Sequence, residues 1–345
     1  METSSRPNRP VTVAEVAARA GVSISTVSKA VNGTGQLRPE TRQRVLQSAR
    51  ELNFQPNQLA RGLLSGRSYT VGILSTDDWG RFTLPLLAGA EDALGAGQLS
   101  MLLCESRGDP IREQHYLRTL TARRVDGIIV TGHSRNVRPS LRTAVNVPVV
   151  YAVTVSDHLD DVSVTYDDTT GAIDAVNHLL ATGRRDIAVV MGPERHVASQ
   201  HRLDGAMRAL QAAGLQPVLG TALFGEWSER WGRDAAARLV NSSHPVDGVF
   251  AASDQIARGI TEGIREAGLR SPDDIGVVGV DNWNVIAEAS RPPLTTVDLN
   301  LEEVGRRAAN RLLEAMEGGR GPAGVELIPT WLAVRQSSEA VLRPA

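Results

Sequence analysis

The first part of the chain has apolar residues at the spacing of helices, with glycines between them. Thr12 is followed three residues later by Glu15, which is the arrangement of a capping box at a helix start. Apolar residues then recur every three or four positions, at Val13, Val16, Ala17 and Ala20. This pattern predicts a first helix that ends at Gly21.

Two more helices follow in the same pattern. Ser23 can cap a second helix with an inward side of Val27, Ala30 and Val31, which Asn32-Gly33 closes. A third helix begins at Pro39, after Arg38, which is a poor N-cap residue. It is expected to run to about Leu52 with its inward residues at Val45, Leu46, Ala49 and Leu52.

From Thr70 onward, short apolar runs alternate with helical patterns. The runs are TVGIL, LSMLLC, VDGIIV, PVVYAV, RDIAVVMG, DGVFAAS and IGVVGV, and the helices between them include 84–96, 171–181 and 255–267. Continuous Val- and Ile-rich strands between helices are typical of parallel sheets that are covered on both faces. There are too many strands for one small unit, so we expect two lobes that face a cleft, with ligand at the carboxyl ends of the strands.

Charge divides the chain in the same place as the pattern does. Residues 1–68 hold ten Lys or Arg against four Asp or Glu, a formal charge of +6, and the overall −2 leaves −8 for the remainder. A basic head on an acidic body favours a polyanion that binds at one end only.

The composition is that of a soluble globular protein. A length of 345 residues with 41% apolar content allows two or three domains. The longest apolar runs fall far short of the roughly 20 residues that span a bilayer, and METSSRPNRP lacks a signal-peptide pattern, so no membrane or export is expected. The one cysteine, Cys104, fits a buried strand position, and a single cysteine fits the reducing cytoplasm. The expected location is therefore the cytoplasm, in association with the nucleoid.

The outward side of the second helix carries an unusual set of residues, namely Ile24, Ser25, Ser28 and Lys29. A solvated three-helix bundle gives no reason to expose Ile24, whereas a helix in the DNA major groove does. There Ile24 can contact a thymine methyl, Ser25 a base edge, and Lys29, the only lysine of the chain, guanine O6 and N7. The hydroxyls of Ser23, Thr26 and Ser28 suit phosphates.

This stretch, VTVAEVAARAGVSISTVSKAVN followed by TRQRVLQSARELNFQPNQLARGLLSGRS, resembles the lactose-repressor (LacI/GalR) family of bacterial transcription regulators. The resemblance implies base contacts by Ile24, Ser25 and Lys29, and mostly backbone contacts by Thr12, Ser23, Thr26 and Asn32. The family cation is often arginine, so Lys29 is a departure that can change the preferred base.

The resemblance extends through a linker at residues 56–68. The segment NQLARGLL predicts a short helix. Gly62 lowers the stability of this helix by about 1 kcal/mol relative to Ala, so the isolated helix would be only marginally stable. The family resemblance implies a hinge helix that orders on DNA and inserts Leu63 into the minor groove. A flexible linker with leucines that pack on the body is the alternative. The expected domains are thus an all-α helix-turn-helix DNA-binding domain at 1–55, the hinge at 56–68, and an effector-binding and dimerisation domain at 69–345.

For the body, the resemblance implies a two-lobed α/β fold like that of periplasmic sugar-binding proteins. One lobe is expected at 69 to about 167 and 298–325, and the other at 168–297 and 326–338. The candidate effector-binding residues lie at strand ends or in family loops: Phe82, Arg202, Trp227, Ser253, Asp254 and Asp281. An aromatic face with a carboxylate and a guanidinium suits a polar, sugar-like ligand.

Structural roles are open for each of these residues. Arg202 and Asp281 can form an ion pair, Asp254 can cap its helix, and Trp227 can belong to the core. Ser253 stands where the family commonly has Asn, which removes an amide from the pocket.

Enzyme motifs do not occur in the chain. Lys29 follows Ser28 rather than preceding Ser or Thr, so there is no phosphate-binding P-loop, and the body has no lysine for a Schiff base. There is no G-x-S-x-G elbow and no H-E-x-x-H helix. His196 and His201 lack a third ligand and are interpreted as solvated loop residues. We expect neither a cofactor nor a metal.

The sequence therefore predicts a DNA-binding transcriptional regulator and not an enzyme. We expect a repressor that binds double-stranded operator DNA as a homodimer and responds to a small sugar-like effector. A solute-binding protein without DNA function is the alternative. If the protein is a regulator, a purine or nucleoside effector and an activator role are further alternatives. The chain has no leucine heptad after WLAVRQSS, which argues against a coiled-coil tetramer.

Overall fold

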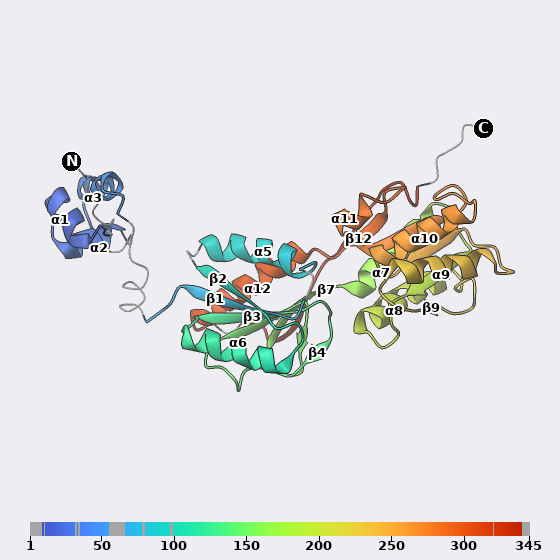
Figure 1. Cartoon of the computed structure of the whole chain (residues 1–345), viewed down its shortest axis with the longest axis horizontal. Coiled ribbons are helices and arrows are strands. Elements are labelled where there is room, and N and C mark those ends of the chain that lie inside the picture. The colour runs from blue at the N-terminus through green and yellow to red at the C-terminus, as the bar shows by residue number, and fades with distance from the viewer. Residues whose placement is uncertain are drawn as a thin grey trace, which may run out of the picture. The chain divides into compact units, whose positions relative to one another are not determined.

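The computed structural model describes residues 9, 11–31, 33, 35–54, 66–77, 80–96, 99–319 and 321–339. It divides into two compact units, Met1–Tyr69 and Thr70–Ala345, here called the head and the body. The head is helical and the body is α/β (Figure 1). Within the described residues, no helix has the length and apolar character needed to cross a membrane.

Three helices make up the described part of the head: α1 (Val13–Ala20), α2 (Ile24–Val31) and α3 (Pro39–Glu51). The capping box of Thr12 and Glu15 is present, and Gly21 ends α1 in the left-handed conformation. The small core includes Val16, Val27 and Val45. Arg38 makes no side-chain cap, as its residue type predicted.

One inward position of α3 was predicted wrongly. Leu46 is 38% exposed, and Ser48 is buried in its place with its hydroxyl donated to Arg44 O at 3.0 Å. The face that meets α1 and α2 follows the spacing of Val45, Ser48 and Ala49, so Leu46 lies about 100° away from it.

The body contains two six-stranded sheets. The first has the order β13-β7-β5-β3-β1-β2, and its strands are β1 (Thr70–Ser75), β2 (Ser100–Glu105), β3 (Gly127–Thr131), β5 (Val149–Ala152), β7 (Val162–Tyr166) and β13 (Gly324–Ile328). All of its pairs are parallel. Helices α5 (Thr83–Ala96) and α12 (Leu301–Met316) lie on one face and α6 (Pro110–Ala122) on the other (Figure 1). Cys104 is buried on β2, as predicted.

The second sheet has the order β14-β12-β11-β10-β8-β9. Its strands are β8 (Ile187–Met191), β9 (Leu223–Phe224), β10 (Gly248–Ala251), β11 (Gly276–Asp281), β12 (Thr295–Asp298) and β14 (Trp331–Ala333), of which only β14 is antiparallel to its neighbour among the described strands. The helices are α7 (Asp168–Ala181), α8 (Val197–Ala212), α9 (Glu229–Val240), α10 (Asp254–Glu266) and the short α11 (Asn284–Ala287).

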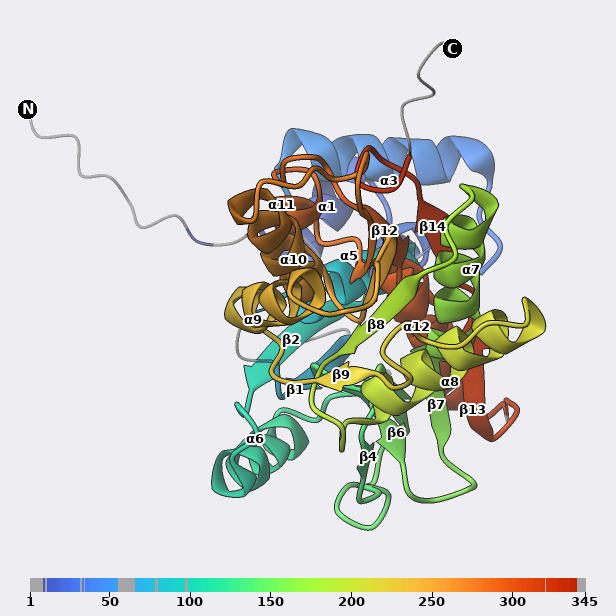
Figure 2. The same ribbon diagram turned by 90° about the vertical axis from the view of Figure 1, so that its right-hand side faces the viewer.

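Alternate residues of the central strands β8, β10 and β11 pack on opposite helix layers. Val189 and Met191 join the core with α7 and α8, whereas Ala188 and Val190 join the core with α9 and α10. Figure 2 shows β8 between these two pairs of helices. Both faces of the sheet are buried by helices, which explains the uninterrupted apolar runs in the sequence.

The chain crosses between the two sheets three times within the described residues. The crossings lie between β7 and α7, between β12 and α12, and between β13 and β14. The last occurs after Ile328, which pairs with Tyr166 of β7, and not at residue 325 as the family resemblance implied. The strand VELI continues the first sheet, because its residues alternate between partial burial and exposure as on an edge strand.

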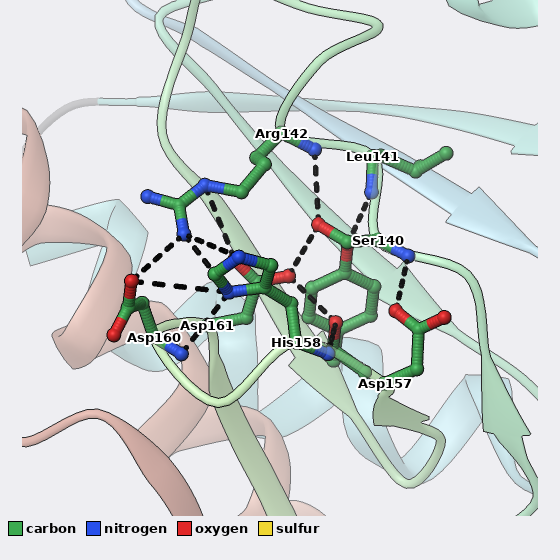
Figure 3. A network of polar contacts seen from close by, with 9 residues as sticks. Ser140, Leu141, Arg142, Asp157, His158, Asp160 and Asp161 are labelled. Atoms are coloured by element: carbon green, nitrogen blue, oxygen red, sulfur yellow. Dashed lines mark hydrogen bonds and ion pairs between the residues drawn. The ribbon is translucent and has the colours of Figure 1, made fainter.

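The first and second lobes are the parts of the body that contain the first and second sheets. Short strands β4 (Val137–Arg138) and β6 (Val155–Ser156) pair at the edge of the first lobe. A polar network holds the adjoining loops together (Figure 3). Asp161 accepts the hydroxyls of Ser140 and Ser156 at 2.6 Å each, and the Tyr151 hydroxyl accepts Leu141 N–H at 2.7 Å. These bonds lie outside the cavity described below and serve to fix the loops.

Candidate functional sites in the head and in the body

Helix α2 is fixed by its N-terminal cap and by its buried face. Ser23 Oγ accepts Thr26 N–H at 3.2 Å and shares hydroxyl contacts with Ser25 and Thr26, both at 2.9 Å. Val27 and Ala30 are buried beneath it, as predicted. The helix therefore has a defined outward side.

That outward side holds the residues predicted to contact DNA. Ile24 is 58% exposed, and Ser25, Ser28 and Lys29 are exposed beside it. Thr26 is half-buried, and Thr12 lies at the start of α1 with its hydroxyl donated to Glu15 Oε2 at 2.8 Å. Asn32 and Leu63, predicted to contact DNA, lie outside the described residues, as does the predicted hinge helix. An exposed isoleucine among hydroxyls and one cation is a surface suited to a base edge and a thymine methyl.

The body has a cavity of about 650 Å³ between the strand ends of its two sheets. Residues from both lobes line it, and the size lies within the range of small-molecule sites. Of the predicted effector residues, Phe82, Arg202, Trp227, Ser253 and Asp281 line this cavity. The structure thus brings together residues that lie up to about 200 positions apart in the sequence.

Arg202 is the centre of a buried ion-pair network. Its Nε donates to Asp168 Oδ1 at 2.7 Å and its Nη1 donates to the carbonyl of Ala252 at 2.6 Å, while Asp281 Oδ1 lies 3.6 Å from Nη1. Only 3% of Arg202 is exposed. Arg202 therefore combines the two roles left open by the sequence, since it lines the cavity and also pairs with Asp281.

Asp281 connects the two lobes. It ends β11 and forms an ion pair with Arg81, which follows β1 of the first sheet. Asp281 and the next residue, Asn282, both have positive φ angles, 117° and 48°. Such backbone angles cost about 1–3 kcal/mol each in a non-glycine residue and tend to occur at functional sites. Here they aim the carboxylate toward the other lobe.

Trp227 is held flat against the end of β8. A Cβ atom at Gly192 would lie 2.5 Å from its ring, and its Nε1 donates to His196 Nδ1 at 2.9 Å. His196 also lines the cavity, and His201 contacts Arg135 through Nδ1 at 3.0 Å. His196 does lie in the loop before α8, although it is half-buried against Trp227, whereas His201 lies within α8, so the interpretation as a loop residue was wrong for His201. Burial lowers the pKa of His201.

Ser253 and Asp254 divide the roles predicted for them. Ser253 lines the cavity and caps α10, with Ile256 N–H donated to its Oγ at 3.2 Å. Asp254 is not among the lining residues. Its two oxygens accept Trp283 N–H at 2.7 Å and the Thr296 hydroxyl at 2.5 Å, and burial raises its pKa to about 6. The helix start turns this carboxylate away from the cavity and into the protein.

Several lining residues were not singled out from the sequence, above all Arg81, Tyr166 and Trp283. The Arg81 guanidinium lies over the rings of Phe82 and Trp283, at 4.9 and 5.1 Å from their centroids. Two of them could have been found from the sequence, because each lies beside a predicted site residue. Arg81 directly precedes Phe82 after β1, and Trp283 follows Asp281 at the end of β11. Among the described residues, no cluster of three His, Cys, Asp or Glu could hold a metal ion.

Comparisons with known proteins cover both units. The family described as "Bacterial regulatory proteins, lacI family" matches residues 12–57, and "Periplasmic binding protein-like domain" matches residues 176–338. Catabolite control protein A of Priestia megaterium is 30% identical over 331 residues, which cover 95% of this chain and 99% of that protein.

Two solved structures extend the comparison. The lac repressor dimer bound to operator and the anti-inducer ONPF has a TM-score of 0.74 and 27% identity, with 96% of this chain and all of that chain covered. A complex of the transcriptional regulator CelR with cellobiose has a TM-score of 0.67 and 30% identity, with 95% and 100% covered. The match therefore extends over nearly the whole chain in sequence and in fold.

Proposed function

Because the chain belongs to the lacI family of bacterial regulatory proteins, which are DNA-binding transcriptional regulators and not enzymes, we propose that it is a repressor controlled by a small sugar-like effector. In this proposal a homodimer binds double-stranded operator DNA, with one head on each half-site. Support comes from the related lac repressor, whose structure is that of a dimer on its operator with a ligand.

The Arg81–Asp281 ion pair across the cavity is the observation that carries the effector part of the proposal. It joins the two lobes at the place where a ligand would lie. A ligand hydroxyl that competes for either partner changes the contact between the lobes, and it can thereby shift the equilibrium between two lobe arrangements. The coupling is reciprocal, so operator DNA must change the affinity for the effector by the same factor.

The cavity chemistry favours a polyol over a nucleobase. The cavity is lined by carboxylates, guanidinium groups and the indole rings of Trp227 and Trp283, which together suit sugar hydroxyls and C–H faces. CelR supports the same choice through its complex with cellobiose. Nucleosides remain the second class to be tested.

In the head, we assign base contacts to Ile24, Ser25 and Lys29, and backbone contacts to Thr12, Ser23, Thr26, Ser28 and Asn32. Leu63 is assigned to the minor groove. For the effector we assign contacts to Phe82, Arg202, Trp227, Ser253 and Asp281, to which Arg81 and Trp283 are added.

The test is operator binding with and without ligand. Operator sequences are selected from random DNA with the full chain, and their binding is followed by fluorescence anisotropy at several salt concentrations. The apparent affinity should fall steeply with salt, since phosphate contacts release counterions. A sugar that binds the chain should then change operator affinity. If operator affinity stays the same when the chain is saturated with each sugar or nucleoside that it binds, the proposal that an effector controls DNA binding is wrong.

A further inference from the structure

A second cavity of about 380 Å³ adjoins the first. The two share four lining residues, Arg81, Phe82, Asp281 and Trp283. The second cavity is otherwise lined mainly by polar side chains and one tryptophan, namely Asn282, Asn284, Asp298, Asn300, Glu302 and Trp331. It lies beside two of the crossings between the lobes.

Arg81 stands at the junction of the two cavities with one hydrogen-bonding group unused. Its terminal nitrogens contact Asp281 and Gln255, the latter at 3.4 Å. Its Nε is buried and has no hydrogen-bond partner among the described residues. A buried donor without an acceptor costs about 1–3 kcal/mol, so a shift of the Arg81 side chain that brings Nε to an oxygen of a bound ligand would be favoured.

The second cavity has the chemistry of a site for neutral hydroxyl groups. Asp298 is held in place by Asn282 Nδ2 at 2.6 Å and by Asn300 N–H at 2.7 Å. Arg81 is the single cationic residue that lines this cavity among the described residues, and its charge is balanced by Asp281, so an anionic ligand has no free cation to bind.

Trp331 supplies an apolar face in this polar cavity. It is 49% exposed on the edge strand β14, although tryptophan is usually well buried. Indole rings of this kind bury the C–H face of a polar ligand while hydroxyl groups bond to the rim.

We propose that the two cavities form one extended site for an oligosaccharide of two or more sugar units, with Arg81 Nε at the linkage between units. This inference rests on the proposed sugar-controlled function and specifies its effector by length. One sugar unit lies in the first cavity beside Trp227 and Arg202. The next lies in the second cavity against Trp331.

The test is calorimetric titration of the full chain with two series of increasing length: glucose, cellobiose and cellotriose, and glucose, maltose and maltotriose. In one series the disaccharide or trisaccharide should bind about tenfold tighter than glucose or more. Trp331→Ala and Asn284→Ala should remove most of this gain and leave the glucose affinity unchanged. Val325 is also 49% exposed but lies on β13, an edge strand of the first sheet, so Val325→Ala should change neither the gain with length nor the glucose affinity.

The outcomes separate this inference from the proposed function. If glucose and its oligomers bind equally, the extended site is wrong and the sugar-controlled regulator stands. A gain with length that survives in both Trp331→Ala and Asn284→Ala also refutes the second cavity. If no sugar of either series binds, the sugar effector itself is wrong, and the extended site with it.

Discussion

In helix α2 the side chains assigned to DNA face solvent, whereas in the cavity the side chains assigned to the effector are bonded to one another. Ile24, Ser25 and Lys29 are exposed and contribute little to the core of the head. Arg202 and Asp281 are 3% and 9% exposed and belong to one ion-pair network. The side chains assigned to DNA are therefore free of contacts with the core of the head, whereas the charged side chains assigned to the effector already pair with one another.

The difference teaches how each site relates to stability. Exposed side chains away from caps and cores change stability by no more than about 0.5 kcal/mol when they are replaced. Removing one member of a buried charge network leaves the others without partners, and this costs several kcal/mol. Substitutions in α2 should therefore affect DNA binding alone, and substitutions in the cavity should affect both binding and folding.

The largest effect is expected from Arg202→Met, which keeps much of the side-chain volume and removes the charge. Asp168 and Asp281 lose a buried partner, so the free energy of unfolding should fall by about 3–5 kcal/mol. All five tryptophans lie in the body, so urea unfolding followed by tryptophan fluorescence measures the body alone. Arg208→Met is the matched control on the same helix. Its exposed pair with Asp204 is worth about 0–1 kcal/mol. Equal losses in the two variants would contradict the comparison.

The next effect concerns pH and Asp254. Burial raises its pKa from 3.8 to about 6, so the folded chain holds this proton at pH values where the unfolded chain has lost it. Its contribution to the free energy of unfolding therefore falls as the pH rises from about 4 to about 6. Asp254→Asn lacks this dependence, and its stability relative to the parent should increase over that interval by on the order of 3 kcal/mol.

Urea unfolding at a series of pH values measures this difference. Asp204→Asn, which changes an exposed carboxylate on α8, controls for the change in net charge. A difference between Asp254→Asn and the parent that stays constant from pH 4 to pH 7 would show that Asp254 keeps an ordinary pKa in the folded chain.

A smaller effect, confined to DNA binding, is expected from Lys29→Ala. Operator affinity should fall by about 1–3 kcal/mol with relaxed preference at one base pair, while the thermal stability of the chain stays the same. The measurement is anisotropy with operators that differ at single positions. A uniform loss for all operators, with a smaller salt dependence, would instead identify Lys29 as a phosphate contact. Arg44→Ala, an exposed cation on α3, is the control for charge.

The smallest effect separates Thr12, a cap residue that is also assigned to the DNA backbone, from Ser25, which is assigned to a base contact. Thr12→Ala removes the capping box and should lower the stability of the head by about 1 kcal/mol. Ser25→Ala should leave this stability within about 0.5 kcal/mol and weaken operator binding. Circular dichroism of the helical signal during thermal unfolding gives the first quantity and anisotropy gives the second. If Ser25→Ala destabilises the head as much as Thr12→Ala does, the outward side of α2 has a structural role as well.

Much of the head could be predicted because its signals are local. The Thr12–Glu15 capping box, the Ser23 cap and the buried Val27 all depend on residues within one or two helical turns. The exception, Leu46, was placed inward by its residue type, whereas the packing of α3 on its neighbours selected Ser48. Exposed Ile24 was predicted because a large apolar residue on an outward face conflicts with the local pattern.

The cavity was predicted less completely, since its residues come from distant strand ends. The rule that ligands bind at the carboxyl ends of parallel strands identified Asp281, and the family resemblance added Phe82, but neither identified Arg81 as the ion-pair partner of Asp281. The rule also could not tell that Asp254, one residue after the lining Ser253, points into the protein. Which of two adjacent residues faces a cavity depends on the turn between strand and helix.

The sequence by itself determined the three helices of the head, seven strands of the body, the basic head and the family, because periodicity, caps and motifs act over short distances along the chain. Tertiary structure alone decided which charges meet. Arg81 meets Asp281 because the two sheets, joined by three crossings, approach each other, whereas Arg202 meets Asp168 and Asp281 through the packing of α7, α8 and β11 within the second lobe. The physical reason is that ion pairs depend on distances of a few ångströms in space, whereas sequence patterns constrain only the path of the backbone nearby.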